Sequence, residues 1–164
     1  MSSSRERLLE SWSPTDEFRR LAEMAATVCS EQTASAQDKP VTKLKSTSQY
    51  EDVQKELGKS YKEMIEIDSS TARVFDPQKF ELHWIPATFV LTGGSFRIPD
   101  DTSAIAIPLV KSGEPKIEYR DASGVSSVID WNTGTIIYMA GKSSLRSDGC
   151  GNASCILFVF KMKA

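Results

Sequence analysis

The spacing of apolar residues divides the chain into a helical first part and an extended second part. Between residues 13 and 29, apolar side chains recur at intervals of three or four: Phe18, Leu21, Ala22, Ala25 and Val28. This period predicts a helix of about four turns with one apolar stripe. Ser13 and Pro14 favour a helix start there, because Ser caps exposed amides and Pro fits the first helical position. The stripe packs either on the rest of the chain, which we take as the default, or on a protein partner, through Phe18, Leu21, Ala25 and Val28.

The next part of the first half carries weaker patterns. From Ser30 to Ser48 the chain is rich in Ser, Thr, Gln and Lys, which predicts a flexible linker. A second, shorter helix is predicted from Tyr50 to Leu57, with Gly58 as its C-cap. We therefore expect a helical arm and linker over residues 1–48, a helical connector over 49–72 and a β domain over 73–164.

The second half consists of short extended runs separated by turn residues. Eight such runs cover residues 79–85, 88–91, 95–98, 103–110, 116–120, 126–131, 135–139 and 155–162. The first alternates Phe80, Leu82 and Trp84 with polar residues, as a half-buried strand does. The last is apolar on both faces up to Lys161, which is typical of a strand covered on both sides. About eight strands at this spacing predict a mainly β sandwich or barrel.

Composition and charge narrow the classes of function. Lys and Arg number 20 against 22 Asp and Glu, so no overall basic field favours nucleic acid. The longest apolar runs are far shorter than a membrane span, and the first residues lack the apolar segment of a secretion signal. Three Cys in 164 residues fit a reducing compartment. We therefore expect an intracellular, most simply cytoplasmic, protein that binds neither nucleic acid nor membrane.

The order of turns in the second half resembles the cupins, the double-stranded β-helix superfamily. Residues 134–141 reproduce the Gly, the apolar strand and the closing turn of the second cupin motif, and residues 97–113 match the position of the first. Ala140 replaces the usual Pro, and Ser143, Ser144 and Leu145 lie where that motif carries its His. The resemblance implies a cupin-like jelly-roll barrel without the superfamily's metal ligands. We accordingly expect no catalytic residue, no metal site and no cofactor.

A narrower resemblance is to the C-terminal domain of type I mannose-6-phosphate isomerases, a cupin-like barrel without the catalytic zinc. It rests on these pieces: Val74–Pro77, Phe80–Trp84, Ser103–Ile107 with Gly113, Gly134–Tyr138 and Ile156–Phe160. They span about residues 73–162. In that family the zinc ligands and phosphosugar-binding residues lie mainly in a preceding domain, for which 72 residues leave too little chain. No active-site residue is therefore carried over.

The groups able to do chemistry are few. His83 is the single His, and one imidazole does not make a metal site or a nucleophile–base pair by itself. Cys150 and Cys155 lie five residues apart, which is the spacing of neither a zinc knuckle nor a redox turn; we expect a loop Cys followed by a buried strand Cys. The candidate acids are Asp100, Asp101, Glu114 and Glu118, which we interpret as solvated turn residues rather than an acid–base pair.

Four aromatic residues are candidates for a ligand site in the barrel mouth: Phe96, Tyr119, Trp131 and Tyr138. An eight-stranded barrel has room for one small ligand, although core packing is the commoner use of such residues. Our main hypothesis is a non-catalytic module that binds a protein partner or forms a homodimer. The alternatives are an inactive or truncated relative of the phosphosugar isomerases, and a binder of a small carbohydrate or metabolite.

Overall fold

Two antiparallel sheets and two helices make up the part of the chain that the computed structural model describes, residues 15–33, 41–67, 80–82, 86–139, 141–148 and 150–162. In chain order the elements are α2 (Asp16–Thr33), β1 (Val41–Leu44), α3 (Ser48–Ile67), β2 (Phe80–Leu82), β3 (Ala87–Leu91), β4 (Ser95–Arg97), β5 (Thr102–Gly113), β6 (Ile117–Arg120), β7 (Ser126–Val128), β8 (Ile137–Met139), β9 (Ser144–Ser147) and β10 (Gly151–Met162). Neither helix is long and apolar enough to cross a membrane, as far as the described residues go.

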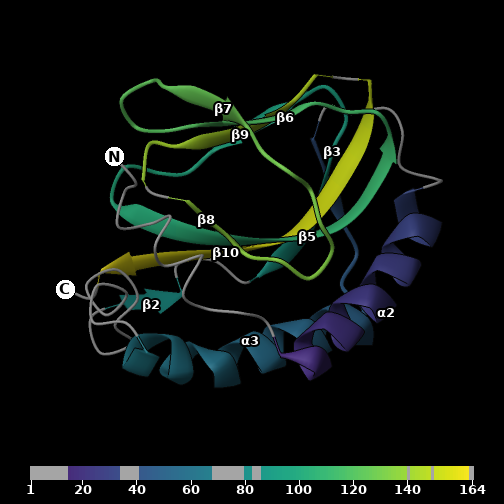
Figure 1. Ribbon diagram of the computed structural model, residues 1–164, viewed down its shortest axis with the longest axis vertical. Helices are drawn as coiled ribbons and strands as arrows, with labels where there is room; N and C mark the ends of the chain where they lie inside the picture. Colours follow the sequence, from purple (N-terminus) through teal and green to yellow (C-terminus); the bar gives the residue numbers. More distant parts are fainter. Residues whose placement is uncertain are drawn as a thin grey trace.

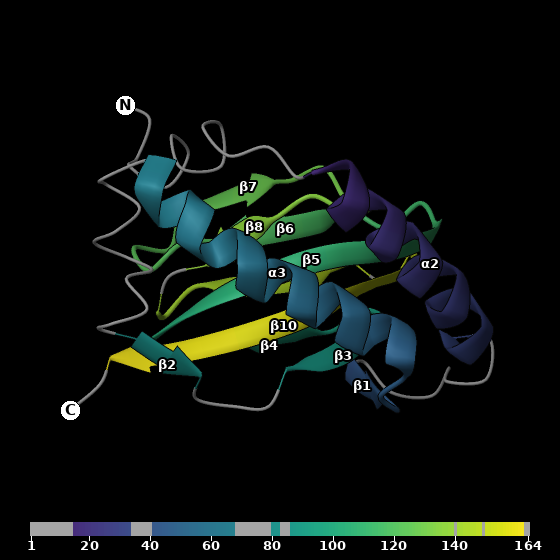
Figure 2. The same ribbon diagram turned by 90° about the horizontal axis from the view of Figure 1, so that it is seen from below.

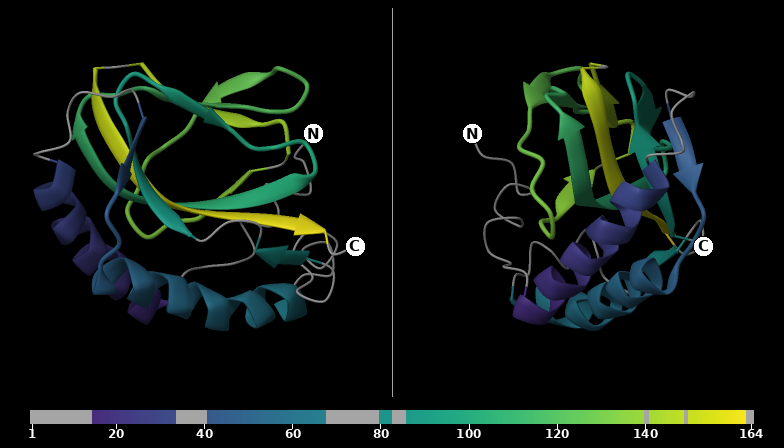
Figure 3. Two further views of the ribbon diagram at one scale, coloured as in Figure 1. Left: turned by 180° about the vertical axis from the view of Figure 1, so that it is seen from behind. Right: turned by 90° about the vertical axis from the view of Figure 1, so that its right-hand side faces the viewer.

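The larger sheet has six strands in the order β1-β3-β10-β5-β8, with β2 paired to β10, and the smaller has four in the order β4-β9-β6-β7. The two helices lie against one face of the larger sheet, and the smaller sheet lies over the other face (Figure 1). Seen from below, α2 and α3 cross in front of β5 and β10 (Figure 2). These two long strands curve strongly toward the smaller sheet (Figure 3). The larger sheet is therefore the middle layer of three.

The middle layer explains why the long strands are apolar on both faces. Along β5, Ile105 and Ile107 belong to the core beneath the helices. Ala104 and Ala106 alternate with them and belong to the core between the sheets. Successive side chains of a strand point to opposite faces, so a strand in the middle layer needs apolar residues at every position. The mainly β class of two packed antiparallel sheets, predicted from the sequence, is confirmed.

The apolar stripe of the first helix packs on the chain itself. Phe18 and Ala25 are fully buried and, with Leu21 packed beside them, join the core formed by the helices and the larger sheet. Val28 is partly exposed. Docking within the chain, the first of the two alternatives, is what the structure shows, and Phe18 and Ala25 are not on an open surface.

Two predictions for the first half are wrong. The expected linker over residues 30–48 contains the end of α2 and the whole of β1, which pairs with β3 from Val41–Leu91 to Leu44–Thr88. A four-residue edge strand carries too little local pattern to be recognised, because its pairing partner lies far along the chain. The second helix does not end at Gly58 but runs on to Ile67. Gly inside a helix costs only about 1 kcal/mol relative to Ala, and the burial of Val53 and Leu57 anchors the preceding turns.

The predicted extended runs correspond to observed strands, with some different bounds. β5 continues through Pro108 to Gly113 because the register with β10 shifts between Ala153 and Cys155, and such a bulge accommodates a residue without an amide donor. The run over 126–131 is a strand only to Val128. The prediction omitted β9, which pairs with both β4 and β6.

Candidate binding site

A buried apolar cluster lies in the space between the two sheets, where a barrel could hold a ligand. The cluster consists of Leu91, Ile98, Ala104, Ala106, Ile117, Trp131, Met139, Leu145, Ala153, Cys155, Leu157 and Val159. Leu145 and Ser143, at the place where the cupin pattern has its His, are both fully buried. Leu145 is part of the apolar cluster, so the side chain at this position packs in the core between the sheets. Within the described ranges, no three His, Cys, Asp or Glu side chains gather in a way that could hold a metal ion.

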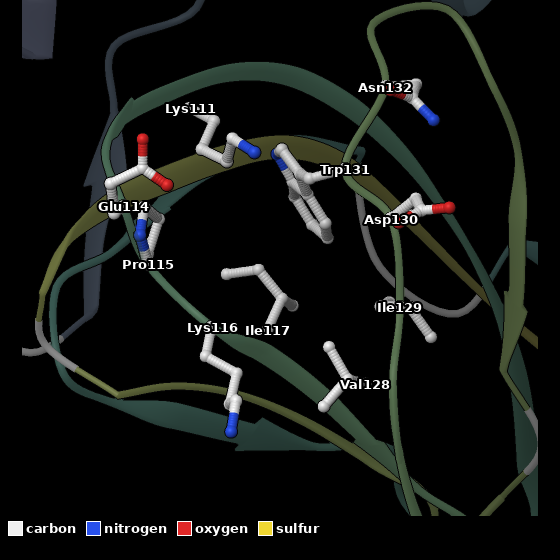
Figure 4. Close-up of a pocket in the computed structure, with 10 residues that line it drawn as sticks. All are labelled: Lys111, Glu114, Pro115, Lys116, Ile117, Val128, Ile129, Asp130, Trp131 and Asn132. Atoms are coloured by element: carbon white, nitrogen blue, oxygen red, sulfur yellow. The ribbon is translucent and has the colours of Figure 1, made fainter.

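A pocket of about 300 Å³ lies at one end of the two sheets. Its lining residues come from two stretches of chain, one from the end of β5 to the start of β6 and one from the end of β7 into the segment that follows it. They are Lys111, Glu114, Pro115, Lys116, Ile117, Val128, Ile129, Asp130, Trp131 and Asn132. Figure 4 shows the side chains of Ile117 and Val128 pointing into the space between the two segments, with the Trp131 indole above them. The pocket has an apolar floor and a polar rim, a combination common in ligand sites. We call it the Trp131 pocket.

Trp131 is held in place by the larger sheet. Its indole Nε1 donates a hydrogen bond to the backbone oxygen of Ser154 on β10, at 3.1 Å, and the residue is only 7% exposed. The hydroxyl of Ser154 lies 3.1 Å from the amide nitrogen of Val110 and 3.0 Å from the sulfur of Cys29 on α2. The pocket floor is thus tied to β5, to β10 and to a helix on the opposite side of the sheet. Such a floor is preorganised rather than adaptable.

The loop beside the pocket is fixed by a carboxylate. Asp148 Oδ1 accepts hydrogen bonds from the amides of Cys150 at 3.0 Å and Lys116 at 3.1 Å. These backbone donors lower the pKa of Asp148 below its ordinary value, since they favour the charged form. The rim itself carries both signs of charge, with two Lys, one Glu and one Asp. It therefore presents polar partners without a strong net field.

Of the four aromatic residues predicted for the barrel mouth, the structure places Trp131 in this pocket. Phe96 and Tyr119 are partly buried and pack against the cluster between the sheets. The hydroxyl of Tyr119 is buried and finds no hydrogen-bond partner in the described part of the chain. Tyr138 pairs in register with Ile105, and its side chain lies outside the described residues. The structure does not gather the four into one site.

The other candidate groups are dispersed. Cys150 is exposed and Cys155 is buried, as expected, and burial raises the pKa of the Cys155 thiol to about 12. A thiol held neutral in this way is a poor nucleophile. His83 falls outside the described residues. Sequence reasoning missed the two Lys of the pocket rim, although their position around the Gly113–Pro115 turn was a usable signal.

β7 forms an open edge next to this pocket. Val125 and Val128 are 64% and 59% exposed, and β7 is the last strand of its sheet. The amide of Asp121 bonds to the oxygen of Val125, and that of Ile129 to the oxygen of Ile117. Because hydrogen-bonded pairs alternate along an antiparallel ladder, the backbone groups of Ser126 and Val128 point away from β6. Among the residues that the structure describes, this edge therefore offers unpaired donors and acceptors to a further strand.

Comparison with known proteins gives the fold alone. No protein-family model matches the chain, and no curated protein matches it either. A Pseudomonas putida prolyl-4-hydroxylase is similar in structure, with a TM-score of 0.51 and 11% identity, over 97% of this chain and 99% of that one. A viral collagen prolyl hydroxylase from Paramecium Bursaria Chlorella virus-1 gives a TM-score of 0.49, 11% identity and coverage of 92% and 90%. An oxalate oxidase gives 0.35 and 14% over 47% and 41%. With two antiparallel sheets in this arrangement, the chain has a cupin-like, double-stranded β-helix fold.

Proposed function

We propose that this chain is a non-catalytic binding module that takes up an extended segment of a partner protein along β7. The observation that carries the proposal is the open edge of β7, with the outward backbone groups of Ser126 and Val128 adjoining the Trp131 pocket. Main-chain bonds to an edge strand supply affinity in such complexes, and pockets for alternate side chains supply specificity.

Val128 belongs to both parts of this surface. It is a residue of the edge strand and also a wall of the pocket. A segment paired with β7 would therefore run past the pocket mouth, where an apolar side chain can cover Ile117 and Trp131. Charged partners for its flanking residues are present in Lys111 and Lys116 and in Glu114 on the rim.

The filled interior supports the non-catalytic part of the proposal. Twelve buried apolar residues of the described part of the chain pack together between the sheets. Interiors packed in this way contribute to stability, and opening them leaves cavities that cost free energy. The binding surface of the proposal is therefore the β7 edge together with the adjoining Trp131 pocket.

The test uses a displayed library of random peptides selected against the whole chain. We expect enriched sequences with alternating apolar residues, and we expect Ser126→Pro to abolish their binding. Proline removes the outward N–H, while the bonds of Ser127 to β6 remain. Ser126→Ala is the matched control, because it keeps the N–H and should retain binding.

Thermal unfolding of both variants shows whether the fold is kept. Failure to enrich any peptide, or equal binding by Ser126→Pro and Ser126→Ala, would overturn the proposal. Sedimentation of the unliganded chain tests the other possible occupant of this edge, which is a second copy of the chain paired through β7. A concentration-dependent dimer that Ser126→Pro dissociates would replace the peptide with self-association at the same edge.

A relationship to the phosphosugar isomerases is a second candidate. Three pieces of the resemblance fall on adjacent strands of the larger sheet: β5 with Ser103–Ile107, β8 with the end of Gly134–Tyr138, and β10 with Ile156–Phe160. A coupled assay with mannose 6-phosphate and added zinc tests it directly. Absence of turnover, combined with binding of the sugar phosphate, would favour an inactive relative, and turnover would refute the non-catalytic proposal.

A further inference from the structure

The outer face of the smaller sheet carries polar residues on every strand. Along β9, Leu145 points into the core between the sheets, so its neighbours Ser144 and Arg146 lie on the opposite face. The same alternation around Phe96 and Tyr119 gives the full set for this face: Ser95 and Arg97 on β4, Ser144 and Arg146 on β9, Glu118 and Arg120 on β6, Ser126 and Val128 on β7. Among these strand residues, three Arg thus share one face with one carboxylate, that of Glu118.

The register brings two of these Arg together. Arg120 lies opposite Ser144 on β9, and Glu118 lies opposite Arg146. Arg120 and Arg146 are therefore diagonal neighbours, a separation that long side chains can span. In the described part of the chain neither guanidinium has a carboxylate within 4.0 Å, whereas Arg97 has Asp100 at 3.5 Å. Two like charges at this spacing repel each other, and an anion between them would relieve that repulsion.

A shallow hollow of about 160 Å³ lies between these side chains. It is lined by Ser95, Glu118, Arg120, Ser126, Ser144 and Arg146. The Ser126 hydroxyl accepts a hydrogen bond from Nε of Arg120 at 3.2 Å, which orients the guanidinium and leaves the hydroxyl proton for a ligand. Two guanidinium groups and three hydroxyls are thus available as donors around one hollow.

We propose that this hollow binds the phosphate group of a small phosphate monoester. A phosphate dianion has three oxygens that accept strong charge-assisted hydrogen bonds, and Arg forks match its geometry. Donors that come from four strands, β4, β9, β6 and β7, suit a tetrahedral anion better than a planar carboxylate. The lone Glu118 and the chain's net charge of −2 disfavour a polyanion such as a nucleic acid. This site shares Ser126 with β7, but it uses the side-chain hydroxyl of Ser126, whereas a segment paired with β7 would use its backbone groups.

The test is a two-dimensional NMR titration of the whole chain with inorganic phosphate, at an ionic strength matched with chloride. We expect shifts confined to the strands of the smaller sheet, largest around Arg120 and Arg146. Arg120→Ala and Arg146→Ala should each weaken binding about tenfold, since each removes charge-assisted bonds. Glu118→Gln should strengthen binding, because it removes the one negative charge in the hollow.

Two further measurements decide the ligand class. Glycerol 3-phosphate should bind at least as well as phosphate, and dimethyl phosphate, a diester with one charge, should bind clearly less well. Arg20→Ala on α2 is the control, because Arg20 is exposed and paired with Glu17 on a different face. Equal weakening by Arg20→Ala, or no gain from Glu118→Gln, would show non-specific screening and overturn the proposal. Thermal unfolding confirms that the variants fold.

Discussion

The two sheets differ in how many of their faces are covered. The larger sheet lies between the helices and the smaller sheet, and in β10 every residue from Ala153 to Phe160 is buried. The described residues cover one face of the smaller sheet, and all three residues of β7 are exposed. The first sheet therefore holds the fold together, while the second leaves one face and one edge free for a ligand. Both proposed sites lie on the second sheet for this reason.

The largest expected effect tests the cover of the larger sheet. Phe18 is fully buried where α2 packs on that sheet. Phe18→Ala should lower the free energy of unfolding by about 3–5 kcal/mol, through lost burial and the cavity left behind. Urea denaturation measures the change. Met24→Ala, on an exposed position of the same helix, should stay within about 0.5 kcal/mol of wild type. Similar losses for both would mean that α2 is not docked.

The next effect separates the two faces of the smaller sheet. Leu145 and Arg146 are adjacent on β9, but Leu145 is fully buried and Arg146 is exposed. Leu145→Ala should cost about 2–5 kcal/mol, whereas Arg146→Ala should change stability by no more than about 0.5 kcal/mol in phosphate-free buffer. Urea denaturation again gives the numbers. A small effect of Leu145→Ala would indicate an interior less filled than described.

A third prediction concerns the connection between the sheets. Trp131 follows β7 in the chain, yet its indole bonds to β10 of the larger sheet. Trp131→Phe keeps an aromatic ring but removes this donor, so the backbone oxygen of Ser154 loses a partner. We expect a loss of about 1–2 kcal/mol, measured by chemical denaturation. Comparing the tryptophan fluorescence of wild type and variant during denaturation should show which part of the signal comes from Trp131. An unchanged stability would mean that the bond contributes nothing net.

The sequence predicted elements whose pattern is local. The stripe from Phe18 to Val28 and the double-sided apolar run of β10 each contain their own period, and both were found. β9 was missed because Ser144–Ser147 holds one apolar residue, and only its register with β4 and β6 makes it a strand. Edge strand β1 has two apolar residues in four, and it too is a strand only through its register, here with β3.

The sites depend even more on long-range pairing. Arg120 and Arg146 are 26 positions apart in the chain and become neighbours only through the β6–β9 register. The Trp131 pocket likewise joins a turn near Gly113 to the segment after β7. The sequence identified Trp131 as a candidate but grouped it with Phe96 and Tyr119, because residue type does not reveal which face of a sheet is covered.

The smallest expected effect concerns the hairpin that presents β7. Asp121 Oδ1 accepts hydrogen bonds from the amides of Ser123 and Val125 and from the Ser123 hydroxyl. These donors lower the pKa of Asp121 below its ordinary value of 3.8. A carboxylate whose pKa is lower in the folded state stabilises the fold above its unfolded pKa, and this contribution is lost as the pH falls through the folded value.

Amide hydrogen exchange at Ser123 and Val125 should therefore accelerate below about pH 3.8, beyond the intrinsic change with pH, while amides of β10 stay protected. In Asp121→Asn the side chain cannot titrate, so the pH-dependent acceleration at these two amides should disappear. If the variant shows the same acceleration as wild type, another group controls the hairpin. If the amides of β10 lose protection together with those of the hairpin, the two sheets open in acid as one unit. That result would contradict the expectation that the smaller sheet, with one covered face, opens locally while the larger sheet stays folded.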